Sequence, residues 1–460
     1  MSLFAPEDPR PLHFMGIGGA GMSAVALVAM HRGVPVTGCD VAPGGAADVE
    51  RRGATVWSGH DCSHVSGCRA VVYTTALPSH HPELEAARAE GILVLTRAEA
   101  LGDVVAGGEV IGISGTHGKT TVTAMVAEAL AEAGIDATAL VGGRVPAWDG
   151  NVRFGSDEIY VVEADEYDRS FLKLTANVAV VNNVEADHLE CYGSVPELES
   201  AFVQFADSAR RVLVGADDDG ANRVGAAVSA PVWHVGLAEN ADVRLTQVRR
   251  REAKQNAARV RLPDGRHVDL RLEVPGLHNL RNAAMAMGVV AALGADVEAA
   301  ARGLERFTGV VRRFEVLGTY KGVTVVDDYA HHPSEIAATL GAARQRYPEA
   351  RLVAVLQPHL YSRTKALGEA MGIALAMADI AVVTDVYPAR EEPIPGVTGE
   401  IVARAARRAG ADVQWIPTLE ALVCGLEDTV VDGDVVVTLG AGDISEVGRE
   451  LTRRLAGVAA

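Results

Sequence analysis

The segment from Val110 to Ala133 constrains the fold more than any other part of this sequence. An apolar run, Val110–Ser114, leads into the glycine-rich sequence GISGTHGKTT at positions 112–121, and an amphipathic stretch, Val122–Ala133, follows. The apolar run predicts a buried strand, and the periodicity after the glycines predicts a helix. A strand that passes through a tight glycine turn into a helix is the basic unit of α/β folds.

The rest of the chain repeats this alternation of short apolar runs and helical patterns, which favours βαβ units and parallel sheets. A chain of 460 residues is long enough for about three domains. Gly107 and Gly108 interrupt the pattern, and another unit begins near Arg313. We therefore expect an α/β protein with three domains, at residues 1–106, 107–312 and 313–460.

The glycine-rich loop has the residue types of a phosphate cradle. Glycines let backbone N–H groups converge on oxygen atoms, and the start of a helix adds a partial positive charge. Lys119 can reach outer phosphates, and the hydroxyl of Thr120 or Thr121 can hold Mg²⁺. The common form G-x-x-x-x-G-K-[ST] would place glycine at position 113, where this chain has Ile. The alternative is a plain glycine turn with a solvated lysine.

Polar side chains follow two further apolar runs of the same region. Glu163 ends the run Ile159–Glu163, and His188 comes shortly after the run Val178–Asn182. In a parallel sheet these strand ends lie at the edge where ligands bind. Glu163 can therefore bind Mg²⁺, and His188 is a candidate ligand for a second cation. An isolated histidine in such a place can also be a capping or core residue.

A second glycine turn, GIGGAG at positions 16–21, lies between a predicted strand, Leu12–Met15, and a predicted helix. Asp40 follows the next strand. The pattern matches a dinucleotide fingerprint and, by itself, suggests an NAD-dependent oxidoreductase. The pattern does not require NAD, because such a loop can bind the diphosphate of any ligand that carries one. Since the first loop already serves ATP, we expect the diphosphate of a nucleotide-sugar substrate here, or a turn without a ligand.

Charge and composition narrow the class of protein. The net charge of −18 argues against a nucleic-acid partner. Five scattered cysteines fit neither a disulfide framework nor a zinc site. The N-terminus does not resemble a signal peptide, and the most apolar stretch, Ala283–Ala295, is too short to span a bilayer. We expect a cytoplasmic protein with no membrane partner.

Taken together and in order, the motifs resemble those of the Mur ligase family, along essentially the whole chain. They are HFMGIGGAGMS at 13–23, GTHGKTT at 115–121, EADE at 163–166, EADH at 185–188, HNLRN at 278–282, RRFE at 312–315, DDYAHHP at 327–333, QPH at 357–359 with SRT at 362–364, and GAGD at 440–443. The resemblance implies a Rossmann-like N-terminal domain that binds UDP, a central P-loop ATPase-like domain, and a Rossmann-like C-terminal domain. The last would help to bind an amino acid and close the site.

The resemblance also implies a role for each matching residue. The catalytic residues would be Lys119, Glu163, His188, Arg313 and Asp328. The cations, two Mg²⁺ with Mn²⁺ as a substitute, would bind Thr120, Glu163 and His188. ATP would contact Gly115, Thr116, Gly118, Lys119, Thr120, Thr121, His278, Asn279, Asn282, Arg313 and Asp328. The other substrates would contact Gly18, Gly19, Gly21, Met22, Ser23, Asp40, Tyr329, His331, His332 and Arg363.

The branch of the family with the nearest motifs joins L-alanine to UDP-N-acetylmuramate at the expense of ATP. The reaction would pass through an acyl phosphate, with His332 or a carboxylate accepting the proton of the amine. The alternatives are a recycling ligase that attaches a preformed peptide to the same sugar nucleotide, an NAD-dependent oxidoreductase, and a nucleotide-sensing module without catalysis. We expect a monomer or a weak homodimer.

Overall fold

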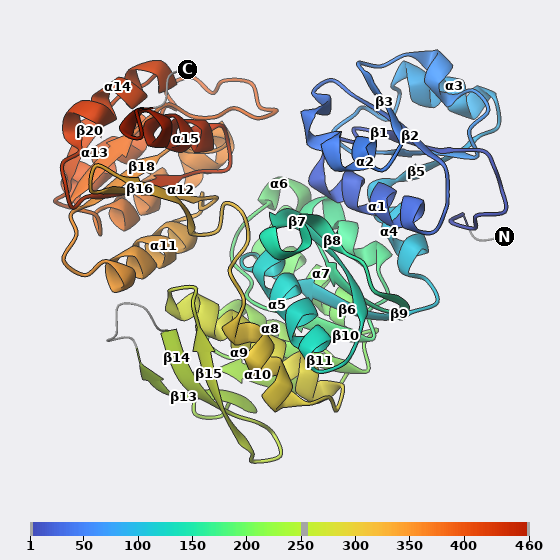
Figure 1. Ribbon diagram of the computed structural model, residues 1–460, viewed down its shortest axis with the longest axis horizontal. Helices are drawn as coiled ribbons and strands as arrows, with labels where there is room; N and C mark the ends of the chain where they lie inside the picture. Colours follow the sequence, from blue (N-terminus) through green and yellow to red (C-terminus); the bar gives the residue numbers. More distant parts are fainter. Residues whose placement is uncertain (1–2, 250–255, 458–460) are drawn as a thin grey trace. The chain divides into compact units, whose positions relative to one another are not determined.

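The computed structural model describes residues 3–249 and 256–457 and has a mixed α/β architecture built on three sheets (Figure 1). The expected α/β class with three domains is confirmed. The exact boundaries at residues 106/107 and 312/313 stay predictions.

The first sheet has five parallel strands in the order β3-β2-β1-β4-β5. The strands β1 and β4 are buried along their length apart from Tyr73, which suits a sheet covered on both faces. The strands are β1 (Leu12–Met15), β2 (Val36–Asp40), β3 (Thr55–Ser58), β4 (Ala70–Tyr73) and β5 (Leu93–Thr96). The helices are α1 (Ala20–His31), η1 (Pro43–Ala46), α2 (Ala47–Arg51), η2 (Cys62–Val65), α3 (Pro82–Ala89) and α4 (Arg97–Val105).

The second sheet has ten strands in the order β15-β14-β13-β12-β11-β10-β6-β9-β7-β8. The strands from β12 to β7 run parallel, and β8 joins the edge antiparallel to β7. The strands are β6 (Glu109–Ser114), β7 (Ala137–Val145), β8 (Gly150–Arg153), β9 (Ser156–Glu163), β10 (Val178–Val181), β11 (Arg211–Gly215), β12 (Val232–Gly236), β13 (Val243–Arg249), β14 (Asn256–Arg261) and β15 (His267–Leu272).

The helices of this central region include α5, which follows β6 and packs against α10 and β7. Its N-terminus lies directly after the glycine-rich loop, so the predicted strand–loop–helix unit is confirmed. The helices are α5 (Lys119–Glu132), η3 (Pro146–Trp148), η4 (Tyr167–Lys173), α6 (Leu189–Tyr192), α7 (Val195–Ala206), α8 (Asp219–Ala227), α9 (Leu277–Ala292) and α10 (Val297–Glu305).

The third sheet has six strands in the order β16-β17-β21-β18-β19-β20, all parallel except the edge strand β16. The strands are β16 (Glu315–Tyr320), β17 (Val323–Asp328), β18 (Leu352–Leu356), β19 (Ile380–Val383), β20 (Asp412–Trp415) and β21 (Val435–Leu439). The helices are α11 (Pro333–Arg346), α12 (Tyr361–Leu375), α13 (Glu400–Arg408), α14 (Leu419–Thr429) and α15 (Ile444–Leu455).

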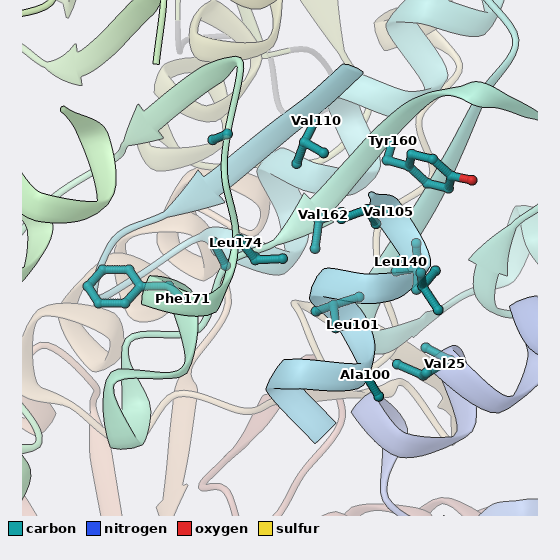
Figure 2. Close-up of a cluster of buried hydrophobic side chains, with 14 of the residues drawn as sticks. Val25, Ala100, Leu101, Val105, Val110, Leu140, Tyr160, Val162, Phe171 and Leu174 are labelled. Carbon is teal, nitrogen blue, oxygen red and sulfur yellow. The ribbon is translucent and has the colours of Figure 1, made fainter. Parts of the chain in front are cut away.

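The chain divides into two compact units. The first runs to Thr246 and includes Arg259–Leu270 and Arg281–Arg306, and the second includes Arg271–Leu280 and the chain from Phe307. Within the first unit, one hydrophobic core joins the first two sheets (Figure 2). Val25 of α1 and Leu101 of α4 belong to the same buried cluster as Leu140 of β7 and Val162 of β9. The N-terminal and central parts of this unit therefore share a core.

Several elements were not predicted from the sequence. The strands β3, β7, β8, β11, β12, β16 and β20 have short or weakly apolar sequences, and the pairing that stabilises them is not visible in a local pattern. The sequence of residues 243–274 is polar and strand-like, and this stretch contains β13, β14 and β15, although residues 250–255 lie outside the described part. Among the described residues, no helix is long and apolar enough to cross a membrane.

Candidate functional site: a phosphate loop and a polar cluster

The glycine-rich loop connects β6 to α5 and is fastened by two asparagines that follow β10. Gly118 has a φ of +82° as the N-cap of α5, and an added Cβ would lie 2.7 Å from Nδ2 of Asn182. The backbone N–H of His117 donates to Oδ1 of Asn183 at 2.7 Å, and Nδ2 of Asn182 donates to the carbonyl of His117 at 2.9 Å. The N–H of Thr116 donates to the carbonyl of Asn183 at 3.0 Å. These bonds fix the conformation of the loop at the N-terminus of α5.

Lys119, at the first position of α5, points back into the loop. Its Nζ donates to the carbonyl oxygen of Gly115 at 2.7 Å and lies 2.7 Å from Oε2 of Glu166. Burial alone would lower the pKa of Lys119, but the carboxylates of Glu166 and Asp165 outweigh it and raise that pKa. These neighbouring carboxylates therefore favour the charged form of Lys119.

Thr120 brings its hydroxyl to the carboxylate at the end of β9. Its Oγ1 donates to Oε1 of Glu163 at 3.0 Å, and the N–H of Gly142 donates to Oε2 at 2.6 Å. The register of β6 against β9 produces this meeting, because Ile113 pairs with Glu163. Thr121, the next residue, is buried in the first turn of α5. A hydroxyl beside a carboxylate at a phosphate loop has the chemistry of a Mg²⁺ site.

His188 lies after β10 and has a left-handed backbone, with φ of +53°, as the N-cap of α6. Its Nε2 lies 3.8 Å from Oδ2 of Asp187, and its ring meets that of Tyr167 edge-on with centroids 5.1 Å apart. Positive φ at a histidine is uncommon and can mark a functional constraint. The side chain is about one-fifth exposed, so it remains accessible to a ligand.

The helix α9 contributes one of its three predicted residues directly to the loop. Oδ1 of Asn282 accepts from Nδ2 of Asn182 at 3.3 Å and would lie 3.0 Å from a Cβ on Gly118. Asn279 instead donates to the carbonyl of Pro275 at 2.7 Å, which fastens the start of α9, and His278 lies beside Gly276 in the same turn.

The N-terminal glycine turn is closed by Asp40, at the end of β2. Its Oδ2 accepts from the N–H of Gly18 at 2.9 Å, and its Oδ1 accepts from Ala42 at 2.8 Å. Gly19 is the N-cap of α1, and Gly21, Met22 and Ser23 form the first turn. The hydroxyl of Ser23 is buried, donates to the carbonyl of Ala20 and accepts from Asn151 of β8 at 3.0 Å. Ser23 thus also joins α1 to the second sheet.

In the second unit, the segment before β16 and the end of β17 form another polar cluster. Arg313 lies over the ring of Tyr329, with Cζ 4.9 Å from the centroid. The carboxylate of Asp328 is buried and accepts from the N–H groups of Phe314 and Ala330, each at 2.8 Å. Burial raises the pKa of Asp328 to about 6, against the opposing effect of Arg313.

The predicted histidines and Arg363 extend this cluster. The N–H groups of His331 and His332 both donate to Oε2 of Glu335, at 3.0 and 3.2 Å, which caps α11. The ring of His331 lies 5.8 Å from that of His359, and Nη1 of Arg363 lies 3.2 Å from Nδ1 of His359. The ring of His331 also lies 5.4 Å from that of Tyr329. Tyr329, His331, His359 and Arg363 therefore form one cluster.

Five side chains of these two groups were not among the predicted site residues: Glu166, Asn182, Asn183, Glu335 and His359. Glu166 and His359 lie inside motifs already singled out, so their motifs were a usable signal. Asn182 and Asn183 follow an apolar strand and could have been found by the same strand-end argument as Glu163. Glu335 is the N3 residue of α11. A glutamate at this position is expected as a helix cap, so the sequence gives no reason to predict a second role for it.

Models of three protein-family domains match the chain. They are "Mur ligase family, catalytic domain" at residues 11–108, "Mur ligase middle domain" at 113–290, and "Mur ligase, glutamate ligase domain" at 312–442. A curated relative, the UDP-N-acetylmuramate–L-alanine ligase of Cutibacterium acnes, is 42% identical over 468 residues, which cover 100% of this chain and 99% of the relative.

Solved structures agree with this result. The UDP-N-acetylmuramate-alanine ligase MurC of Thermotoga maritima superposes with a TM-score of 0.83 at 29% identity, covering 97% of this chain and 99% of that one. A murein peptide ligase of Psychrobacter arcticus gives a TM-score of 0.73 at 24% identity over 98% of this chain and 100% of that one, and so shows a shared fold alone. The full-length identity, the three domain matches and the phosphate loop all lead to one conclusion: this chain belongs to the Mur ligase family.

Proposed function

We propose that this chain uses ATP to join L-alanine to the lactyl carboxylate of UDP-N-acetylmuramate, with release of ADP and phosphate, as a step in making peptidoglycan precursors. The observation that carries the proposal is the phosphate loop, where a buried lysine and a Thr–Glu pair meet at the start of α5. The full-length relatives that carry the name of this ligase supply the identity of the acid and the amine.

The nucleotide is assigned to the loop between β6 and α5. The backbone N–H groups at the N-terminus of α5 would receive the phosphates, since those of Thr116 and His117 already donate to Asn183. Lys119 would exchange its bond with Glu166 for one with a phosphate oxygen. Asn282 and the start of α9, with His278 and Asn279, would lie beside the nucleoside. Arg313 and Asp328 are assigned to the same nucleotide by their place in the matching motifs.

Mg²⁺ fits the residues at the end of β9. The hydroxyl of Thr120 and the carboxylate of Glu163 already share one location, and oxygen ligands of this kind suit Mg²⁺. His188 would serve a second cation, for which Mn²⁺ could substitute. When bound, the cations would neutralise negative charge on the phosphate oxygens.

The reaction requires activation of a carboxylate. An oxygen of the lactyl carboxylate attacks the γ-phosphorus, the bond between that phosphorus and ADP breaks, and an acyl phosphate forms. Lys119 would stabilise the charge on the transferring group, which needs positioning and electrostatics rather than a protein nucleophile. The glycine turn at Gly18, Gly19 and Gly21, with Asp40, would hold the diphosphate of the UDP-sugar.

The second step forms the amide. The nitrogen of L-alanine attacks the acyl carbon, the bond to the phosphate oxygen breaks, and the amine loses a proton. We assign the amino acid to the cluster of Tyr329, His331, His332 and Arg363, where a guanidinium can pair with a carboxylate. His332 or a neighbouring carboxylate would accept the proton.

The acyl phosphate can be tested with isotope. UDP-N-acetylmuramate labelled with ¹⁸O in both oxygens of its carboxylate is mixed with ATP, Mg²⁺ and L-alanine, and the released phosphate is analysed by mass spectrometry. The mechanism predicts one ¹⁸O atom in each phosphate molecule, because the carboxylate oxygen leaves with the phosphoryl group. Unlabelled phosphate would contradict the proposal and indicate simple hydrolysis of ATP.

A further inference from the structure

Away from the phosphate loop, another group of side chains that could hold a metal ion lies in the first unit, where β1 and β2 of the first sheet meet η2 and α3. We call it the N-terminal histidine cluster, and it consists of His13 on β1, Cys39 on β2, His64 in η2 and Glu83 on α3. Three members have almost no exposed surface, and the side chain of His64 is 11% exposed. None of the four has a part in the reaction proposed above.

The distances inside the cluster are those of ligands around one ion. Sγ of Cys39 lies 3.4 Å from Nε2 of His13 and 3.6 Å from each carboxylate oxygen of Glu83. Nε2 of His13 lies 3.7 Å from Oε1 of Glu83. Tetrahedral Zn²⁺ with bonds of ~2.0–2.3 Å separates its ligand atoms by ~3.3–3.7 Å. Nδ1 of His64 lies closer, 2.9 Å from Oε1 of Glu83, so these two atoms would have to move apart to bind one ion. All four ligand atoms lie within 4.8 Å of one another.

Outer contacts orient the ligand atoms toward this centre. Nδ1 of His13 is bonded to Oγ1 of Thr37 at 3.0 Å, so that Nε2 faces the cluster. The ring of His64 stacks on Trp57, with centroids 4.4 Å apart. The second oxygen of Glu83 is bonded to Nδ1 of His60 at 2.8 Å. Metal-bound histidines and carboxylates in proteins are held by outer partners of this kind.

We propose that His13, Cys39, His64 and Glu83 bind one Zn²⁺. The ligand set combines a thiolate, two imidazoles and a carboxylate, which is the donor chemistry of zinc rather than of Mg²⁺ or Ca²⁺. A thiolate, a carboxylate and two neutral imidazoles carry two negative charges, so the buried complex would be neutral. The site would be structural, because all four positions around the metal would be taken by protein.

The competing interpretation is a network of hydrogen bonds without metal. Burial alone would raise the pKa of Glu83, but contacts with His13 and His60 outweigh it and lower that pKa to about 2, so the histidines can also stabilise the carboxylate. In this network the protonated thiol of Cys39 would donate to the carboxylate of Glu83, whose two oxygens each lie 3.6 Å from Sγ. The two interpretations therefore differ in whether Cys39 is a ligand.

A metal bound at the cluster would cross-link several elements of the N-terminal domain. It would tie β1 and β2 to η2 and α3, and Cys39 immediately precedes Asp40, which closes the glycine turn. Zn²⁺ would hence stabilise the N-terminal domain against unfolding, in the way that structural zinc does in other folds.

The first test uses the full chain, freed of metal with a chelator and then reloaded. Addition of Co²⁺ should produce a thiolate-to-cobalt charge-transfer band, which a metal at the phosphate loop cannot give. The band should disappear in Cys39→Ser and persist in Cys62→Ser, a matched control because Cys62 is exposed. Absence of the band in the wild-type chain, or its persistence in Cys39→Ser, would overturn the proposal.

The second test measures zinc retention and melting temperature, first in the wild-type protein. Wild-type protein dialysed against Zn²⁺ and then against metal-free buffer should retain about one Zn²⁺ per chain, with a melting temperature above that of the chelator-treated protein. Thr37→Val should keep the fold but weaken Zn²⁺ binding at least ~10-fold, through loss of the outer contact to His13. A wild-type chain that retains no zinc and melts at the same temperature with and without it would establish the metal-free network instead.

Discussion

The Nζ atom of Lys119 lies 2.7 Å from Oε2 of Glu166, and this ion pair is buried inside the phosphate loop. The lysine also donates to the carbonyl of Gly115 at 2.7 Å. The loop thus holds its lysine with protein groups, and under the proposed function a nucleotide phosphate would replace Glu166 as its partner. Substitutions of Lys119 and of Glu166 should therefore have different effects on turnover and on stability.

Lys119→Ala should reduce turnover by ~100-fold or more. The variant loses at least one charge-assisted hydrogen bond to phosphate, worth ~1.5–3 kcal/mol, and a larger interaction in the transition state. Steady-state phosphate release with all three substrates measures the effect. Lys173→Ala is the matched control, because its exposed ion pair with Glu99 should matter little. Near-normal turnover in Lys119→Ala would remove the lysine from the mechanism.

Glu166→Gln should destabilise the nucleotide-free protein and make it depend more on ADP. Removing one partner of a buried pair costs about 3 kcal/mol, and a bound phosphate replaces the missing negative charge. Differential scanning fluorimetry should show a lower melting temperature without ADP and a larger rise on adding ADP and Mg²⁺ than in the wild type. Glu158→Gln, at an exposed residue of β9, controls for the loss of charge. Equal rises in both proteins would argue against exchange at Lys119.

Thr120→Ala should raise the Mg²⁺ concentration needed for half-maximal activity roughly tenfold, since one lost ligand contact is worth ~1.4 kcal/mol. The hydroxyl that meets Glu163 is absent in this variant, while the loop backbone is unchanged. Thr123→Ala is the comparison, because the hydroxyl of Thr123 donates to the carbonyl of Lys119 at 2.9 Å within α5. The same Mg²⁺ dependence in both variants would place the cation elsewhere.

Asp328 should give the second unit a distinctive dependence on pH. Burial raises its pKa from 3.8 to about 6 in the folded state. The folded chain then binds more protons than the unfolded chain between these values, so the stabilising effect present below pH 4 is lost as the pH rises toward 6. A shift of this size corresponds to about 3 kcal/mol.

The test compares the protein that has Asp328 with the variant Asp328→Asn, whose side chain cannot titrate. Unfolding by denaturant is followed by the fluorescence of Trp415, with the other three tryptophans replaced by phenylalanine. The free energy of unfolding of the Asp328 protein, relative to the Asn variant, should fall between pH 4 and pH 6 and then stay level. A difference that is independent of pH would show that Asp328 titrates normally.

The strand–loop–helix unit at residues 110–133 could be predicted from the local sequence. The run Val110–Ser114, the glycines after it and the helix that follows were predicted because each has its own periodicity and turn chemistry. The strands β7 and β8 were missed because they are stabilised by pairing at a sheet edge. The core that joins α1 to β7 was also invisible, since contacts distant in sequence leave no local signal.

The candidate site shows the same division. Thr120 and Glu163 were both predicted, and the register of β6 with β9 brings them to 3.0 Å. The partner of Lys119 was not predicted, because a carboxylate next to a proposed metal ligand gives no sign of which cation it meets. The spacing of the cysteines gives no sign that Cys39 could be a metal ligand, because the five cysteines are scattered along the chain. Its neighbours His13 and Glu83 come from strands and helices that only the fold brings together.

The most direct test of the proposed function is phosphate release from ATP with UDP-N-acetylmuramate in three parallel reactions, with L-alanine, with a tripeptide and with no amine. The proposed function predicts release only with L-alanine, together with a product heavier by one alanyl residue. Release only with the tripeptide would contradict it and indicate a recycling ligase, and release that ignores the amine would contradict amide formation altogether.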